Sequence, residues 1–181
     1  MSDDQKAYHA LKSLAHLSLQ AAQQLPAQAD STPQWSGVGF SLMGINFVVS
    51  MGELNEMLEV PSYTKLPGVR SWVRGVANVR GRLLPVFDLA AYFGSSLTGA
   101  KKQQRLLVID RDKIYAGLWV DQVFGMQYFP VDTRTENLPE ALPSSLEGFV
   151  EGCFEFESRS WVVFHPLRLM EQGNFLDVAE A

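Results

Sequence analysis

The chain has 181 residues, enough for one or two small domains in which about 70% of the unfolded surface is buried on folding. A single cysteine, Cys153, excludes an intramolecular disulfide. Asp3 and Asp4 stand where a signal peptide would carry Lys or Arg, and no apolar run approaches the roughly 20 residues of a membrane span. We therefore expect a cytoplasmic, soluble protein without direct membrane insertion.

The net charge of −5 is unevenly distributed along the chain. Lysines and arginines counted against carboxylates give −4 for residues 1–64, +7 for residues 65–113 and −8 for residues 114–181. Such separation would serve electrostatic pairing with protein partners or self-association, unless the charges mix once the chain is folded.

The N-terminal region, residues 1–35, reads as a helical extension followed by a linker. Apolar residues recur at helical spacing and would form one face of an amphipathic helix over residues 5–25: Leu11, Leu14, Ala15, Ala22 and Leu25. Pro26 ends this pattern, and residues 26–34 have almost nothing to bury. The helix would either pack on the body of the protein or engage a partner.

A tight hairpin is predicted for residues 73–89, where two apolar arms flank Arg80-Gly81-Arg82. Gly81 supplies the positive φ that a compact turn requires, and Asn78 can hydrogen-bond nearby backbone. Arg80 has no such local structural reason. The hairpin therefore presents an exposed cation.

Two further hairpins are predicted, one joining residues 106–109 to 114–120 and one joining 149–157 to 161–164. In the last of these, alternation would place Phe154 on a buried face and Cys153 on a wet, acidic one. Short helical patterns cover residues 52–58, 88–93 and 166–172. Strands at such short spacing indicate a mainly β fold built as barrels or a sandwich.

The hairpin sequence closely resembles the signature of the CheW family of bacterial chemotaxis coupling proteins. Its run Gly-Val-Ala-Asn-Val-Arg-Gly, residues 75–81, is followed by Pro-Val-Phe-Asp-Leu, residues 85–89. A Gly-Leu-Trp-Val-Asp-Gln-Val element at residues 117–123 fits the same family, and the likeness covers about residues 38–170. The long extension and the segment 128–133 make the chain most similar, within this family, to adaptors of type IV pilus chemosensory systems.

The resemblance implies a CheW-like domain over residues 36–175, made of two packed, small, five-stranded SH3-like β-barrel subdomains with short helices. On that reading, subdomain 1 comprises about residues 36–82 plus 149–170. Subdomain 2 comprises about residues 83–148.

No arrangement of side chains in the sequence indicates catalysis, a cofactor or a metal. His9 and His16 could share a helical face but lack a third ligand nearby. Cys153 lies between carboxylates, which disfavour a thiolate, and His165 at a strand end suits a structural hydrogen bond. We expect a protein that is not an enzyme.

Nucleic acid is a weak candidate partner. Lys101, Lys102 and Arg105 make a short basic cluster with no interleaved aromatic residues for base stacking. We expect no nucleic-acid partner.

The resemblance implies instead a non-catalytic adaptor that couples chemoreceptor tips to the regulatory domain of a CheA-type histidine kinase. Asn78 and Arg80 match the family's receptor-binding turn, with Gly81 as its structural residue. Leu54, Glu56 and Met57 align with another part of that receptor-binding groove.

Other interpretations stay open for the same residues. Leu54 and Met57 could belong to the core, and Glu56 could form a salt bridge with Arg80. For the whole chain, the alternative is a small-ligand-sensing β-barrel signalling module, which a sizeable apolar pocket between the barrels would favour.

Overall fold

The structure is a computed structural model that describes Gln5, residues 12–14 and residues 33–179. The chain forms two compact units, Met1–Thr32 and Pro33–Ala181. In the first unit, Gln5 and residues 12–14 are helical, and the remainder of the predicted amphipathic helix lies outside the described residues. The second unit contains every strand that the structure describes.

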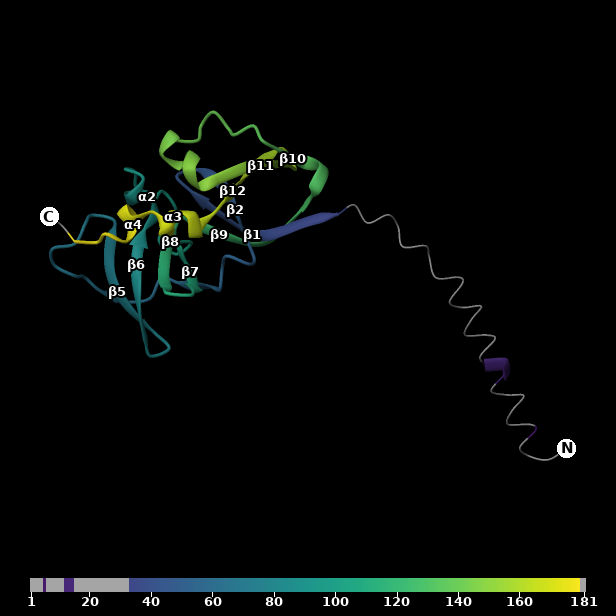
Figure 1. The fold of residues 1–181 in the computed structure, drawn as a ribbon, viewed down its shortest axis with the longest axis horizontal. Helices are drawn as coiled ribbons and strands as arrows, with labels where there is room; N and C mark the ends of the chain where they lie inside the picture. The colour runs from purple at the N-terminus through teal and green to yellow at the C-terminus, as the bar shows by residue number, and fades with distance from the viewer. Residues whose placement is uncertain (1–4, 6–11, 15–32, 180–181) are drawn as a thin grey trace. The chain divides into compact units, whose positions relative to one another are not determined.

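Two six-stranded sheets form the second unit (Figure 1). Sheet A has the order β10-β11-β12-β2-β1-β9 and contains β1 (Gln34–Leu42), β2 (Ile45–Ser50), β9 (Gln122–Pro130), β10 (Arg134–Thr135), β11 (Val150–Phe156) and β12 (Arg159–Phe164). Sheet B has the order β3-β7-β8-β6-β5-β4 and contains β3 (Glu56–Glu59), β4 (Tyr63–Thr64), β5 (Val73–Val79), β6 (Arg82–Asp88), β7 (Arg105–Arg111) and β8 (Ile114–Val120). The expected mainly β fold is confirmed, with one two-residue strand in each sheet beyond the five expected.

Both sheets are strongly curled. The edge strands of sheet B, β3 and β4, are connected by residues 60–62 alone, and those of sheet A, β9 and β10, by residues 131–133. A flat six-stranded sheet places its edges about 24 Å apart, whereas the chain from Glu59 to Tyr63 reaches at most about 14 Å. The edges must therefore approach each other, as in the expected barrels.

Three apolar clusters follow from this curling, one inside each sheet and one between the sheets. Leu106 and Val108 of β7 contribute to the cluster inside sheet B, and Leu107 and Ile109 to the large cluster between the sheets. The interior of sheet A is aromatic: Phe129 stacks on Phe154 with ring centroids 4.8 Å apart. Strands that bury both faces explain the near-continuous apolar runs in the sequence.

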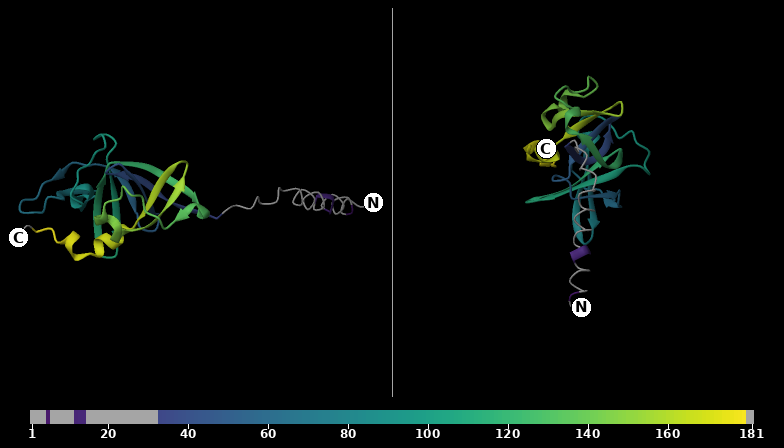
Figure 2. Two further views of the ribbon diagram at one scale, coloured as in Figure 1. Left: turned by 90° about the horizontal axis from the view of Figure 1, so that it is seen from above. Right: turned by 90° about the vertical axis from the view of Figure 1, so that its right-hand side faces the viewer.

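The helices described in the second unit are short and lie along the connections. They are α2 (Leu89–Tyr92), two 3-10 helices (Val131–Thr133 and Ser144–Phe149), α3 (Pro166–Glu171) and α4 (Gly173–Leu176). The last two carry the chain from sheet A back beside sheet B (Figure 2). There, Val69 in the connection between β4 and β5 pairs with Ala179. The helical patterns at residues 88–93 and 166–172 thus contain α2 and α3.

The sheets divide the chain differently from the expected subdomain boundaries. The proposed division between residues 82 and 83 would separate β5 from β6. These two strands pair as one hairpin in sheet B, from Val73 opposite Phe87 to Val79 opposite Arg82. Residues 122–130, expected in subdomain 2, form β9 of sheet A. Two-residue turns keep adjacent strands in one sheet, so a boundary inside such a hairpin was wrong.

Two local expectations were also wrong. The helical pattern over residues 52–58 is a turn followed by β3, whose pairing with β7 outweighs local periodicity. Cys153 is fully buried rather than wet, because a bulge at Gly152, with φ of +68°, shifts the alternation of β11 by one residue.

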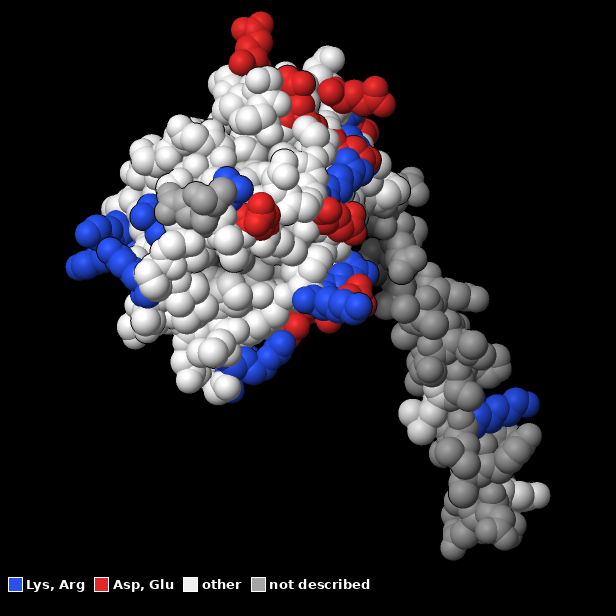
Figure 3. Space-filling model, turned by 60° about the vertical axis from the view of Figure 1, so that its left-hand side comes forward, with Lys and Arg blue, Asp and Glu red and all other residues white. Residues whose placement is uncertain are grey.

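The charge separation persists in the folded unit. Residues 51–120, which carry sheet B, hold ten lysines and arginines and six carboxylates, whereas residues 33–50 and 121–179 hold three and ten. On the face shown in Figure 3, carboxylates gather at the top and cations at the left and lower edge. The part of the chain that carries sheet B is therefore net positive and the part that carries sheet A net negative, although Arg70 and Asp177 form an ion pair between the two parts.

Asp88 is a fully buried carboxylate at the end of β6. Its Oδ1 accepts the N–H of Ala91 at 2.9 Å and so caps α2, and its Oδ2 accepts a bond of 3.0 Å from Nε of Arg74. This aspartate of the family-like motif thus has a structural role, because it fixes the chain where the hairpin enters a helix.

Asp121 lies where the chain crosses from β8 of sheet B to β9 of sheet A, and it is 2% exposed. Its carboxylate accepts the N–H groups of Met43 at 2.8 Å and Gly99 at 2.7 Å, together with the N–H and the hydroxyl of Thr98. One side chain therefore holds the β1–β2 turn and the loop before β7 against the crossing.

We predict that Asp121→Asn lowers the free energy of unfolding by about 3 kcal/mol. The amide removes the charged acceptor of these N–H groups, and its own NH₂ group would face one or more of the same donors. Urea denaturation followed by tryptophan fluorescence measures this change. Asp112→Asn, in an exposed turn with φ of +52°, is the control and should change stability by less than about 0.5 kcal/mol. Equal midpoints for the two variants would show that the buried charge is dispensable.

Candidate functional site

The β5–β6 turn is the exposed tip of sheet B. Its two loop residues, Arg80 and Gly81, have φ of +53° and +81°, as in a two-residue turn of the I′ class. The Gly81 N–H donates to Oδ1 of Asn78 at 2.9 Å. The predicted tight hairpin is thus confirmed, with the left-handed conformation extending to Arg80, whose side chain is 77% exposed.

Arg80 and Glu56 meet across the mouth of the curled sheet. Nη2 of Arg80 lies 2.8 Å from Oε2 of Glu56, although β7 and β8 separate the Glu56 strand from the hairpin in sheet order. The alternative that these two residues form a salt bridge is therefore what the structure shows. Because Arg80 is so exposed, such a pair stabilises the fold by at most about 1 kcal/mol.

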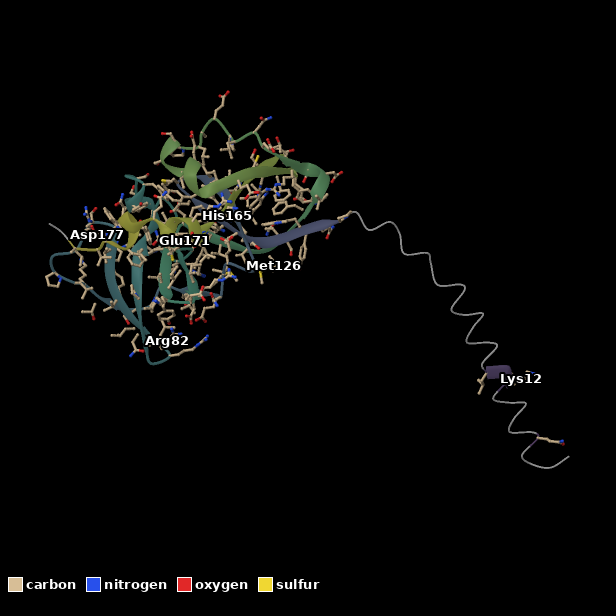
Figure 4. All side chains as sticks on the ribbon, in the orientation of Figure 1. Lys12, Arg82, Met126, His165, Glu171 and Asp177 are labelled. Carbon is tan, nitrogen blue, oxygen red and sulfur yellow. The ribbon has the colours of Figure 1, made fainter. Side chains whose placement is uncertain are left out.

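A second ion pair lies beside the first and was not predicted. Nη1 of Arg82 lies 2.5 Å from Oδ2 of Asp110, and its guanidinium stacks 3.9 Å from the ring centroid of Tyr115. The hydrogen bond from Arg82 lowers the pKa of Asp110. Figure 4 places Arg82 near the lower tip of sheet B. Arg82 and Asp110 are 28 residues apart in sequence, so no local sequence pattern indicates their contact.

Asn55 connects this polar cluster to β3. Its Oδ1 accepts the N–H of Asp110 at 2.7 Å, and its own N–H donates to the carbonyl of Val108 at 3.0 Å. The start of β3 is therefore fixed against the end of β7.

The apolar members of the predicted site differ in exposure. Leu54 is half-buried and packs against the large cluster between the sheets, as its core interpretation requires. Met57 is 42% exposed, so it is available to a partner. Leu83, absent from the predicted set, is 67% exposed and pairs with Asn78 across the hairpin. Its position next to the predicted turn was the sequence feature from which its exposure could have been inferred.

The described residues offer little catalytic chemistry. Among them, no three His, Cys, Asp or Glu side chains are grouped as metal ligands. Burial, together with the nearby Glu155, raises the pKa of the Cys153 thiol to about 11. None of the helices in the described ranges has the length and apolar content needed to cross a membrane.

An aromatic hollow lies away from the turn. Its lining comes from Trp72, the α2 region, the segment before β11 and the α3–α4 connection: Trp72, Tyr92, Phe93, Ser145, Gly148, Phe149 and Gln172. Within the described part of the chain, the buried Nε1 of Trp72 has no hydrogen-bond partner. This hollow is where a small ligand would bind if the alternative function held.

We predict that Gly81→Val destabilises the protein by about 1–2 kcal/mol, because a β-branched residue is strained at a φ of +81°. Thermal unfolding followed by circular dichroism measures the loss. Gly148→Ala is the matched control, since a Cβ there meets no atom within 4 Å. A Gly81 variant as stable as the control would contradict the observed turn.

We also predict that the native Cys153 thiol resists alkylation at neutral pH, because a pKa of about 11 leaves almost no thiolate. Labelling by iodoacetamide should accelerate as the pH rises toward 11 and at any pH after unfolding in guanidinium chloride. Stability should correspondingly fall above the ordinary thiol pKa of about 8.5, because only the unfolded chain then ionises freely. Rapid labelling of the folded protein at pH 7 would show the thiol to be accessible.

Comparison with known proteins confirms the family resemblance. The model of the CheW-like domain matches residues 36–173. Protein PilI of Pseudomonas aeruginosa is 48% identical over 179 residues, which cover 99% of each chain. Chemotaxis protein CheW of Thermotoga maritima is 28% identical over 54% of this chain and 64% of its own.

A solved structure shows the same fold. The crystal structure of scaffolding protein TtCheW from Thermoanaerobacter tengcongensis superposes with a TM-score of 0.65 at 24% identity and covers 81% of this chain and 99% of that one. The hairpin motif, the two curled sheets and these similarities lead to one conclusion: the chain belongs to the CheW-like domain family.

Proposed function

We propose that this protein is a non-catalytic adaptor that couples chemoreceptor tips to the regulatory domain of a CheA-type histidine kinase. The observation that carries this proposal is the position of Arg80: a left-handed, two-residue turn holds its guanidinium out in solvent at the centre of the family motif. A planar guanidinium in that position suits a partner's carboxylate or backbone carbonyls.

The receptor-binding surface in this proposal consists of Leu54, Glu56, Met57, Asn78 and Arg80. The surface ion pair between Glu56 and Arg80 is weak enough to be exchanged for contacts with a partner. Met57 is exposed beside it and supplies apolar area, and Asn78 holds the turn through Gly81. Leu83, exposed opposite Asn78 on the hairpin, is a further apolar side chain near the turn.

The adaptor would transmit a receptor's state through contacts alone. Coupling of this kind needs a difference in contact free energy between two receptor states, typically about 1–3 kcal/mol. The opposite charge balance of the two sheets supports docking of a second protein, the kinase domain, on a surface separate from the β5–β6 turn.

We further propose that the output is type IV pilus motility and that the protein works in the cytoplasm, recruited to membrane-associated receptors. Support comes from the 48% identity to PilI, whose match spans the N-terminal extension as well as the CheW-like domain.

We predict that Arg80→Glu lowers receptor affinity at least about tenfold, equivalent to about 1.4 kcal/mol, because it reverses the charge at the proposed contact. Kinase binding should be unchanged, and the melting temperature should fall by less than about 4 °C, since an exposed ion pair contributes little. Titration calorimetry with a receptor-tip fragment and the kinase regulatory domain from the same genome measures both affinities.

Two variants sharpen this test. Arg159→Glu makes the same charge change at the exposed start of β12 in sheet A and should leave receptor binding intact. The double variant Glu56→Arg/Arg80→Glu can restore the internal ion pair but not receptor binding. Recovery of binding in the double variant would mean that Arg80 acts only through Glu56. No binding of the wild type to either protein would favour the ligand-sensing alternative and its aromatic hollow.

A further inference from the structure

His165 lies between the end of β12 and the start of α3, close to the middle of the folded unit in Figure 4. Its backbone N–H donates to the carbonyl of Phe149 at 2.8 Å, and its imidazole is 17% exposed. The backbone of His165 is therefore fixed between β12 and the 3-10 helix Ser144–Phe149.

Two carboxylates face the two ring nitrogens. Nδ1 lies 2.8 Å from Oε1 of Glu53, and Nε2 lies 3.2 Å from Oε2 of Glu151 in a geometry too bent for a good hydrogen bond. Arg134 and Arg168 are the other charged groups at this cluster, and both contact Glu151. The hydrogen bond from Arg134 lowers the pKa of Glu151, so this carboxylate stays ionised in mild acid.

The chemistry of the two groups sets the direction of the contact with Glu53. An ionised carboxylate can only accept hydrogen bonds, so Nδ1 of His165 donates to Oε1 of Glu53.

Glu53 links this cluster to the candidate site. It lies in the turn between β2 and β3, immediately before Leu54 and three residues before Glu56. Its carboxylate is 18% exposed, and within the described residues its second oxygen, Oε2, has no hydrogen-bond partner. The contact with His165 therefore holds the chain entering the site on the sheet A side, as Asn55 holds it on the sheet B side.

We infer that His165 is a positioning residue for the proposed receptor-binding surface: its imidazole ties Glu53 to sheet A and so fixes segment 53–57. Its effect on receptor binding rests on the proposed function, whereas its effect on the segment does not.

Amide hydrogen exchange of the full chain tests the tie without any partner. The variants His165→Gln and Glu53→Gln should each lower the protection factors of residues 54–57 about tenfold, and the double variant should add little. Glu59→Gln is the matched control, because it removes the same charge from the adjoining strand, where Glu59 is 90% exposed. Additive losses in the double variant, or an equal loss in the control, would overturn the inference.

Receptor affinity is measured separately with the receptor-tip fragment. His165→Gln should weaken it about threefold to tenfold while Arg80 is intact, since a looser segment binds less well. Unchanged affinity alongside lost protection would overturn the link to the receptor-binding surface. If the wild type binds no receptor, the proposed function fails, and the exchange data still decide whether the tie exists.

Discussion

The fold depends on one buried carboxylate at the passage between its two sheets. Asp121 receives backbone N–H groups from the β1–β2 turn and from the loop before β7, so parts of the chain about 55 residues apart are fixed at one point. The crossing itself is short, because β8 ends at Val120 and β9 begins at Gln122. Because a single residue connects β8 to β9, the two sheets have little freedom to move at this point. Their relative orientation is set by the Asp121 side chain and by the apolar cluster between the sheets.

The sequence predicted the elements that depend on neighbouring residues. Apolar arms around Arg80 and Gly81 identified the β5–β6 hairpin, and the same reasoning located the β7–β8 and β11–β12 hairpins. The two strands of a hairpin are close in sequence, so their pattern can be recognised within one stretch of the chain. The family resemblance then supplied the fold class and the choice of Asn78 and Arg80, which composition and periodicity could not.

What the sequence did not predict depends on contacts between distant residues or on one irregular backbone position. The pair formed by Arg82 and Asp110 joins two hairpins, and sheet curvature alone brings Glu56 to Arg80. The bulge at Gly152 moved Cys153 from the expected wet face into the core, because period-two alternation assumes a regular strand. For the same reason, β3 could not be told from a helix until its pairing with β7 was known.

Stability and recognition use different kinds of charge in this protein. Asp88 and Asp121 are buried and fully engaged, so replacing either leaves donors without a partner. The exposed pair of Glu56 and Arg80 contributes little to the fold, and its groups can be transferred to a partner at small cost. The proposed adaptor function needs this division, because a surface that changes its contacts with a partner cannot also hold the fold together. His165 lies between the two classes: it is mostly buried, yet its contact with Glu53 lies next to the proposed receptor-binding surface.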